Sequence, residues 1–253
     1  MREILASGII ELKIQLRYPL NMLFNVVASL FTLIPLIVIT TLFNYSNYTW
    51  IISGGLIWMF ISQAIWTIGL SLRSEQHRGP LEQVLLSPSR LSRIIVGKSL
   101  ITVVLNFVTA LIGLSVIKLF ISPQLGIGLC VLVILISIPA IYGLAFIVSV
   151  IVLKMKEVFA LLQVATALLM VLSGVCQPIS MLSPTLAQAS KFIVFEQIVS
   201  LFRSCADGTA AIGTVVLPVS LILLEGAIIL AIGLVMLERF QRKTLLNGEA
   251  LNV

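Results

Sequence analysis

Six long apolar segments constrain the fold of this chain more than any other feature of its sequence. They cover approximately residues 20–43, 50–72, 99–117, 125–153, 158–176 and 211–237. A helix needs about 20 apolar residues to cross the hydrocarbon core of a bilayer. A backbone exposed to lipid must satisfy its own hydrogen bonds, which a helix does. We therefore expect an all-α integral membrane protein with six transmembrane helices in a single domain, 1–253.

The composition agrees with this class and excludes a soluble globular protein. The chain is 59% hydrophobic and 10% charged, whereas soluble domains carry about 25% charged residues. Its mean hydropathy is +1.16. In such a chain, a formal net charge of +6 indicates basic residues that set orientation and contact anionic headgroups. We expect a lipid membrane as the partner of these charges, and no nucleic acid.

Lysine and arginine are distributed unevenly between the two sides of the expected spans. The basic side holds thirteen of them: Arg2, Lys13, Arg17, Arg73, Arg78, Arg90, Arg93, Lys98, Lys154, Lys156, Arg239, Arg242 and Lys243. The opposite side holds three, Lys118, Lys191 and Arg203. Cytoplasmic segments carry the excess of basic residues. We therefore expect a multi-pass protein of the cell (inner or plasma) membrane with both termini in the cytoplasm.

The residues before the first span have the pattern of an amphipathic helix. Within residues 3–18, an apolar stripe at helical spacing is formed by Leu5, Ile9, Leu12 and Leu16. The stripe predicts an interfacial helix that lies on the membrane and ends before Pro19.

A second amphipathic segment lies between the fifth and sixth spans, on the expected external side. Its apolar face contains Phe195 and Phe202, and its polar face contains Glu196 and Arg203. This pattern predicts an external helix that either lies flat in the outer headgroups or dips back into the membrane. We hypothesise that these four residues form an external gate. A plain connector is the alternative.

Motifs of intrinsic catalysis and of metal binding are absent from the sequence. It contains no G-x-x-x-x-G-K-[ST], no G-x-S-x-G and no H-E-x-x-H, one histidine, and three cysteines without a CxxC. We expect no enzymatic activity and no cofactor in this chain. A bridge between Cys176 and Cys205 stays open, with apolar filling as the simpler interpretation.

One carboxylate lies deep in an expected span. Glu225 occurs near the middle of the sixth apolar segment, in L-I-L-L-E-G-A, where a charge costs about 3 kcal/mol on insertion scales. Two interpretations stay open: a contact in a substrate or proton pathway, or a hydrogen-bonded group that holds helices together. Gln63 and Asn106 are candidate polar neighbours.

The expected cytoplasmic loop between the second and third spans concentrates the charge that lies between helices. It contains the run G-P-L-E-Q-V-L-L-S-P, residues 79–88. Gly79 and Pro80 suit the start of a short helix, and Pro88 its end. Three leucines and a valine give this helix an apolar surface, to which Glu82 adds a charge. Such a helix fits a groove on a soluble partner. A solvated loop that only sets topology is the alternative.

This loop resembles the signature of ABC-2 type transporter permeases. In that family a Glu, a Gly–Thr/Ser–Leu–Glu core, a short apolar run and a Pro lie between spans two and three. The counterparts here are Glu75, Gly79, Leu81, Glu82 and Pro88. Pro80 departs from the pattern, because the family has Thr or Ser at this position. Proline keeps the helix start but removes a hydroxyl cap. Span number, chain length and the two amphipathic helices extend the resemblance over nearly the whole chain.

The resemblance implies the membrane-spanning permease subunit of an ATP-driven ABC exporter of the drug or small-amphiphile branch. Its coupling helix to a separate ABC ATPase would comprise Glu75, Gly79, Pro80, Leu81, Glu82, Val84, Leu85 and Pro88. Two ATPase copies would carry ATP and Mg. A second permease copy, as homodimer or heterodimer, would complete a path that works by alternating access.

The resemblance also implies that spans two and five line the substrate path. The residues that they would expose are Trp58, Gln63, Trp66, Gln163 and Thr166, and we add Glu225 as a further candidate. A path lined by apolar and aromatic residues with few charges suits an amphiphilic or drug-like substrate.

Three alternatives stay open at this stage. One is a permease for haem-related or polysaccharide export. Another is a membrane scaffold that binds an ATPase without transporting anything. The third is a membrane-embedded enzyme that uses Glu225.

Overall fold

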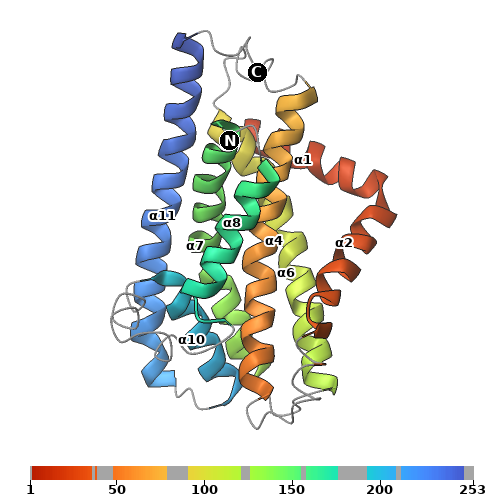
Figure 1. The fold of residues 1–253 in the computed structure, drawn as a ribbon, viewed down its shortest axis with the longest axis vertical. Helices are drawn as coiled ribbons and strands as arrows, with labels where there is room; N and C mark the ends of the chain where they lie inside the picture. Colours follow the sequence, from red (N-terminus) through yellow and green to blue (C-terminus); the bar gives the residue numbers. More distant parts are fainter. Residues whose placement is uncertain are drawn as a thin grey trace.

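The computed structural model is an all-helical bundle within the residues that it describes, namely 2–35, 38, 48–78, 91–120, 126–154, 158–175, 193–208 and 212–247 (Figure 1). The helices are α1 (Arg2–Arg17), α2 (Pro19–Phe31), α4 (Tyr48–Arg78), α6 (Leu91–Phe120), α7 (Ile127–Lys154), α8 (Val158–Leu172), α10 (Val194–Ala206) and α11 (Ile212–Asn247). No strand occurs in these ranges, in agreement with the expected all-α class.

Four of these helices are long and apolar enough to cross a bilayer. They are α4, α6, α7 and α11, with apolar windows of 21, 27, 27 and 29 residues. The expected span 158–176 appears as the shorter apolar helix α8. The expected span 20–43 is described only in part, and its described portion begins with the apolar helix α2. The 15 residues of α8 extend for about 22 Å at 1.5 Å per residue, less than the roughly 30 Å of a hydrocarbon core. The described residues thus contain four helices with the length and composition of a full crossing.

The centre of the bundle is formed by α7, which packs along both α4 and α11. The contact with α11 depends on small residues. A Cβ on Gly143 of α7 would lie 2.5 Å from the Leu230 nitrogen, and one on Gly233 of α11 would lie 2.7 Å from the Gly143 oxygen. Lipid tails are as apolar as the helices themselves, so close backbone packing at small residues contributes much of the attraction between them.

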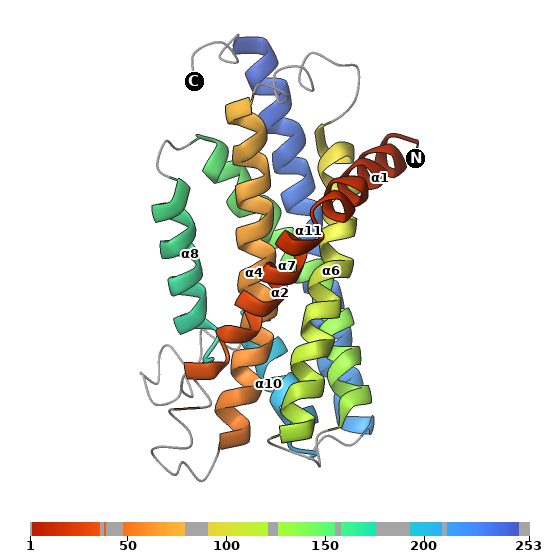
Figure 2. The ribbon, with the colours of Figure 1, turned by 90° about the vertical axis from the view of Figure 1, so that its right-hand side faces the viewer.

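The first helix packs across the start of α6 (Figure 2). Ser7 and Gly8 of α1 are buried there, and a Cβ on Gly97 of α6 would overlap the Ser7 hydroxyl. The predicted apolar stripe of α1 points away from α6, with Leu5 65% and Leu16 66% exposed. This orientation leaves the stripe available to lipid, as expected of an interfacial helix.

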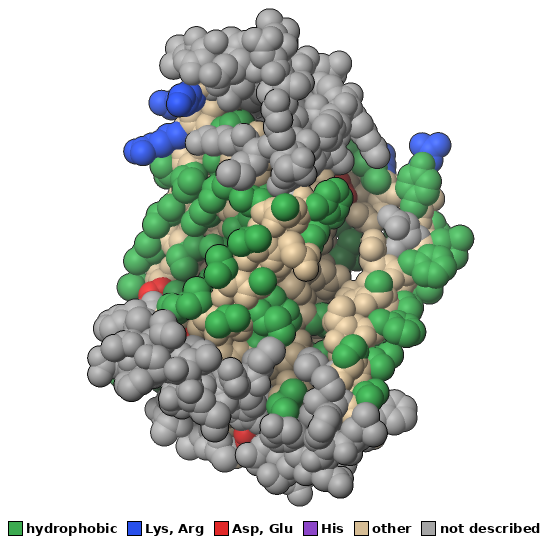
Figure 3. All heavy atoms as spheres, viewed as in Figure 1, with side chains coloured by type: hydrophobic (Ala, Val, Ile, Leu, Met, Phe, Trp, Pro, Cys, Tyr) green, Lys and Arg blue, Asp and Glu red, His purple; other side chains and the backbone are tan. Residues whose placement is uncertain are grey.

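One end of the bundle holds α1, the last turns of α4, the first turns of α6 and the last turns of α11 (top of Figure 1). Exposed basic side chains occur at this end, at Arg239, Arg242 and Lys243 of α11 and on α1 (blue in Figure 3). The opposite end holds α10 and the first turns of α11. Basic residues of α1 and α11, which the sequence assigned to the same side of the membrane, therefore lie at the same end of the bundle.

Candidate functional site

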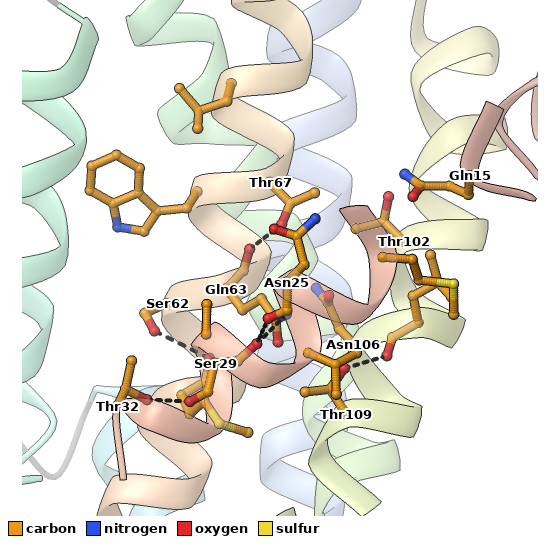
Figure 4. Close-up of a pocket in the computed structure, with 17 residues that line it drawn as sticks. Gln15, Asn25, Ser29, Thr32, Ser62, Gln63, Thr67, Thr102, Asn106 and Thr109 are labelled. Carbon is orange, nitrogen blue, oxygen red and sulfur yellow. Dashed lines mark hydrogen bonds between the residues drawn. The ribbon is translucent and has the colours of Figure 1, made fainter. Parts of the chain in front are cut away.

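A cavity of about 550 Å³ lies between α2, α4 and α6, with Gln15 of α1 at its margin. Figure 4 shows its polar side chains pointing into the space between the three helices. They are Gln15, Asn25, Ser29, Thr32, Ser62, Gln63, Thr67, Thr102, Asn106 and Thr109. The described apolar lining consists of Met22, Val26, Ala28, Met59, Trp66, Leu70 and Leu105. A largely uncharged polar cavity inside an apolar bundle is a candidate binding site.

The polar lining follows from helical spacing. On α2 and its C-cap the series Asn25, Ser29, Thr32 falls at i, i+4 and i+7, and on α6 the series Thr102, Asn106, Thr109 does the same. Residues at this spacing lie on one face of a helix. Sequence reasoning missed both series, although the spacing is visible in the sequence once the apolar segments are assigned to helices.

Gln63 joins α4 to α2 across the cavity. Its Nε2 donates to the Ser29 hydroxyl oxygen at 3.2 Å. That hydroxyl in turn donates its proton to the Asn25 carbonyl, so it has only acceptor capacity left for Gln63. The amide is therefore oriented with its nitrogen towards Ser29. Its Oε1 is buried and has no hydrogen-bond donor among the described residues.

Asn106 closes the back of the cavity. This side chain is buried, and its Nδ2 donates to the Tyr142 hydroxyl oxygen of α7 at 3.0 Å. The hydrogen bond connects the cavity wall on α6 to the central helix of the bundle. Because both partners are buried, breaking it would leave polar groups unsatisfied.

The residues of α4 and α8 that were predicted to line the substrate path do not all lie in one place. Gln63 and Trp66 line the cavity. Trp58 packs half-buried against the core, and Gln163 is exposed on α8. Thr166 is buried and donates to the Leu162 carbonyl of its own helix at 2.8 Å. These last three are outside the set that lines the cavity.

Glu225 lies on α11, beside α10. Gln197 of α10 donates from Nε2 to the Glu225 Oε2 at 3.4 Å. The candidate neighbours Gln63 and Asn106 instead lie together in the cavity between α2, α4 and α6. Of the two interpretations of Glu225, this contact favours a hydrogen-bonded group that links helices.

The predicted external helix corresponds to α10, which packs against α4, α7 and α11 and does not lie flat on the surface. Phe195 is 5% and Phe202 1% exposed, and Glu196 is half-buried. The amphipathic face is therefore covered by protein. Cys205 of the same helix is a free, buried thiol, and Cys176 lies outside the described residues.

Arg203 of α10 connects this helix to the end of α8. Its Nη1 donates to the Gly174 carbonyl at 3.1 Å and its Nη2 to the Val175 carbonyl at 2.7 Å. The guanidinium thus pairs with two carbonyls just beyond the C-terminus of α8, where a positive charge is favourable. Gly54 of α4 makes room for it, since a Cβ there would lie 2.5 Å from Nη2. Sequence reasoning had placed Arg203 on an external polar face, whereas it is buried.

The predicted coupling segment, 79–88, lies outside the described residues. The helices that flank it are described: α4 ends at Arg78 and α6 begins at Leu91. Both extend beyond the expected spans 50–72 and 99–117, and Glu75 falls within the last turns of α4. In the sequence, the segment therefore follows α4 and precedes α6.

A comparison with known families gives a match to the ABC-2 type transporter family over residues 8–206. No curated protein matches the chain significantly. The matched range contains the described lining of the cavity and the segment 79–88, and it ends with α10. Since it covers more than three quarters of the sequence, the chain belongs to the ABC-2 type transporter family.

Proposed function

We propose that the chain is the permease subunit of an ATP-driven exporter, coupled through residues 79–88 to a separate ATPase subunit. Membership of a transporter membrane family is the observation that carries this proposal. The sequence contains no phosphate-binding loop of its own. ATP and Mg would therefore be bound by the partner.

The helices around the coupling segment suit the transmission of force. The helix before the segment, α4, packs against the central helix α7. The helix after it, α6, packs against α1. The close contact at Gly97 lies within the first two turns of α6. A push on the segment would therefore move α4, α6 and α1 together. Closure of two ATPase copies would drive such a push and switch the path between inward-open and outward-open states.

The proposed assembly contains two ATPase copies and a second permease copy, in the plasma membrane with both termini in the cytoplasm. The gathering of basic side chains at one end of the bundle supports this orientation. Exposed apolar side chains along α8 and α11 offer surface for lipid or for a second copy. An amphiphilic or drug-like substrate fits the polar cavity within an apolar bundle.

Co-purification with the ATPase tests the proposal. The full chain is purified from its native membrane in mild detergent, as wild type and as Glu82→Arg, and a co-purifying P-loop ATPase is sought. Asp207→Arg is the matched control: it makes the same charge change at an exposed residue that directly follows α10, at the opposite end of the bundle.

We expect the ATPase to accompany the wild type and Asp207→Arg and to be lost or uncoupled with Glu82→Arg. Absence of an ATPase from folded wild type would contradict the proposal. An ATPase that binds but is not stimulated by any substrate in liposomes would favour a scaffold. ATP-dependent transport of haem or polysaccharide would keep the permease function and replace the drug-like substrate.

A further inference from the structure

We propose that the cavity between α2, α4 and α6 binds the uncharged, hydroxyl-bearing headgroup of an amphiphile whose alkyl chain remains in the lipid beside α2. This inference rests on the proposed transport function and narrows its substrate class. Four features of the cavity support it: the absence of charge in its described lining, its several hydroxyl acceptors, its depth in the bundle and its open side.

The lining disfavours a charged ligand. None of the described residues that line the cavity is ionisable. A formal charge moved from water into such a site would lose its hydration without gaining a counter-charge. Beside the lining, the Glu11 carboxylate accepts a hydrogen bond from the Gln15 amide at 3.1 Å. Glu11 and Lys98 line the same small neighbouring cavity, so charges of both signs lie there.

The hydrogen-bond inventory of the lining indicates a ligand that both donates and accepts. The amides of Gln15, Asn25, Gln63 and Asn106 offer N–H donors, whereas the hydroxyl groups offer acceptors. The hydroxyl protons of the lining are bound within their own helices. Ser62 donates to the Met59 carbonyl, Thr67 to that of Gln63, Thr102 to that of Lys98, Thr109 to that of Leu105, Ser29 to that of Asn25 and Thr32 to that of Ser29. Each hydroxyl oxygen retains acceptor capacity.

The buried Oε1 of Gln63 has no donor among the described residues. Left unsatisfied in a bundle of this kind, such an oxygen destabilises the protein. A ligand with several hydroxyl groups would donate to the hydroxyl oxygens, and it would reach Oε1 once a rotation of the Gln63 amide turns this oxygen towards the cavity. A thioether, ester or alkyl group supplies no such donors.

The cavity lies halfway along the transmembrane helices. Gln63 is the central residue of α4, Tyr48–Arg78, and Asn106 lies at the centre of α6, Leu91–Phe120. A headgroup bound there would be midway across the bilayer. That position suits an intermediate stage in moving an amphiphile from one leaflet to the other.

One side of the cavity is open and faces apolar surface. Asn25 and Ala28 on α2 and its C-cap Thr32 are exposed, whereas Asn106 and Thr109 on α6 are buried. Figure 3 shows a hollow between the α2 region at the right and the rest of the bundle. The outer face of α2 carries exposed Leu20, Leu23, Phe24, Val27 and Phe31. A headgroup can enter from the side while its alkyl chain lies along this face. The volume of about 550 Å³ is within the roughly 300–1,000 Å³ of small-molecule sites.

Quenching of Trp66 fluorescence tests the inference, because Trp66 lines the cavity. The full chain, with Trp50→Phe and Trp58→Phe, is placed in phosphatidylcholine nanodiscs. The probe is an alkyl β-glucoside brominated next to its headgroup. Two further probes carry the same brominated chain with a methyl ether or a trimethylammonium group in place of the sugar. They measure quenching that arises from partition into lipid alone.

We expect the glucoside to quench at about tenfold lower concentration than either control probe, and Gln63→Leu to weaken it roughly five- to tenfold. Ser29→Ala, which releases the Gln63 amide, should weaken it about twofold and provides the test if Gln63→Leu does not fold. Ser115→Ala is the matched control. Ser115 also donates to its i−4 carbonyl, at 2.8 Å, but is exposed outside the cavity lining, so glucoside quenching should not change.

Equal quenching by the three probes would overturn the inference, as would an unchanged response in folded Gln63→Leu. ATPase co-purification from the same membranes keeps the two proposals apart. If the ATPase binds and the glucoside does not quench selectively, the headgroup inference fails and the permease proposal stands. If selective quenching depends on Gln63 but no ATPase associates, the site stands and the permease proposal fails.

Discussion

Replacement of Gly143 by alanine should separate the two most closely packed helices of the bundle. The new Cβ would lie 2.5 Å from the nitrogen and 2.7 Å from the Cα of Leu230, and 2.8 Å from the carbonyl carbon of Ile229. All three atoms are backbone, so no side-chain rotation relieves the contact. Ordinary carbon contacts are about 3.5–4.0 Å. Helices α7 and α11 must therefore move apart by about 1 Å.

The magnitude follows from this separation. Overpacking of a close interface costs about 1–3 kcal/mol, and a gap of about 1 Å forfeits up to about half of each remaining dispersion contact. The higher helix propensity of alanine offsets up to about 1 kcal/mol. We expect a net loss of about 2 kcal/mol, equivalent to about 4–8 °C in Tm for a chain of this size.

Thermal unfolding in detergent, followed by the loss of the monodisperse peak in size-exclusion chromatography, measures the effect. Gly128→Ala is the matched control on the same helix, because a Cβ there has no neighbour within 4 Å. Its stability should stay within about 0.5 kcal/mol of wild type. Equal Tm values for the two variants would refute the packing argument. Rescue of Gly143→Ala by Leu230→Ala would also refute it, since the predicted contact is with backbone.

Three further predictions concern α10 and α1. Arg203→Met should lower stability by about 3 kcal/mol, because two buried carbonyls lose their donor. Arg242→Met, at an exposed arginine, should leave the stability measured by thermal unfolding within about 0.5 kcal/mol of wild type. Equal losses of stability in the two variants would contradict the pairing of Arg203 with these carbonyls. Gly97→Ala would overlap the Ser7 hydroxyl and should expose α1 to limited proteolysis; an unchanged cleavage pattern would argue against the α1–α6 contact. Burial raises the pKa of the Cys205 thiol, so its thiolate fraction at pH 8 falls below that of a free cysteine. Alkylation of Cys205 in the folded protein should therefore be slow and should accelerate as the pH rises further. Alkylation at the rate of a free thiol would count against its burial.

Local pattern in the sequence predicted most of the helices because lipid restricts the choice of backbone structure. Apolar runs identified α4, α6, α7 and α11, and helical periodicity identified α1 and α10. The family signature around Glu82 indicated a transporter before any contact was known, and the family match agrees with it. The prediction was less successful for 158–176, which ends early as α8. The chain turns after this helix at Gly174, which has a φ of 66°, a conformation that favours glycine.

The candidate site was predicted only in part. Of the residues that the family resemblance assigned to a substrate path, Gln63 and Trp66 line the cavity, and their role in transport stays a prediction. For Glu225 the sequence offered Gln63 and Asn106 as candidate neighbours without pairing them, and the hydrogen-bond partner in the structure is Gln197 of α10. Periodicity determines which residues share a face, but not which neighbouring helix that face meets.

The sequence by itself determined the class of protein, the approximate helices and the clustering of basic charge, because hydrophobic length and backbone hydrogen bonding are local properties of the chain. Tertiary structure alone decided that α10 is buried, that Arg203 pairs with the end of α8, and that three polar faces meet in one cavity. These outcomes depend on how each helix is rotated and how closely it approaches its neighbours. The rotation and the approach of each helix are set by contacts between residues far apart in the sequence, such as that of Gly143 with Leu230.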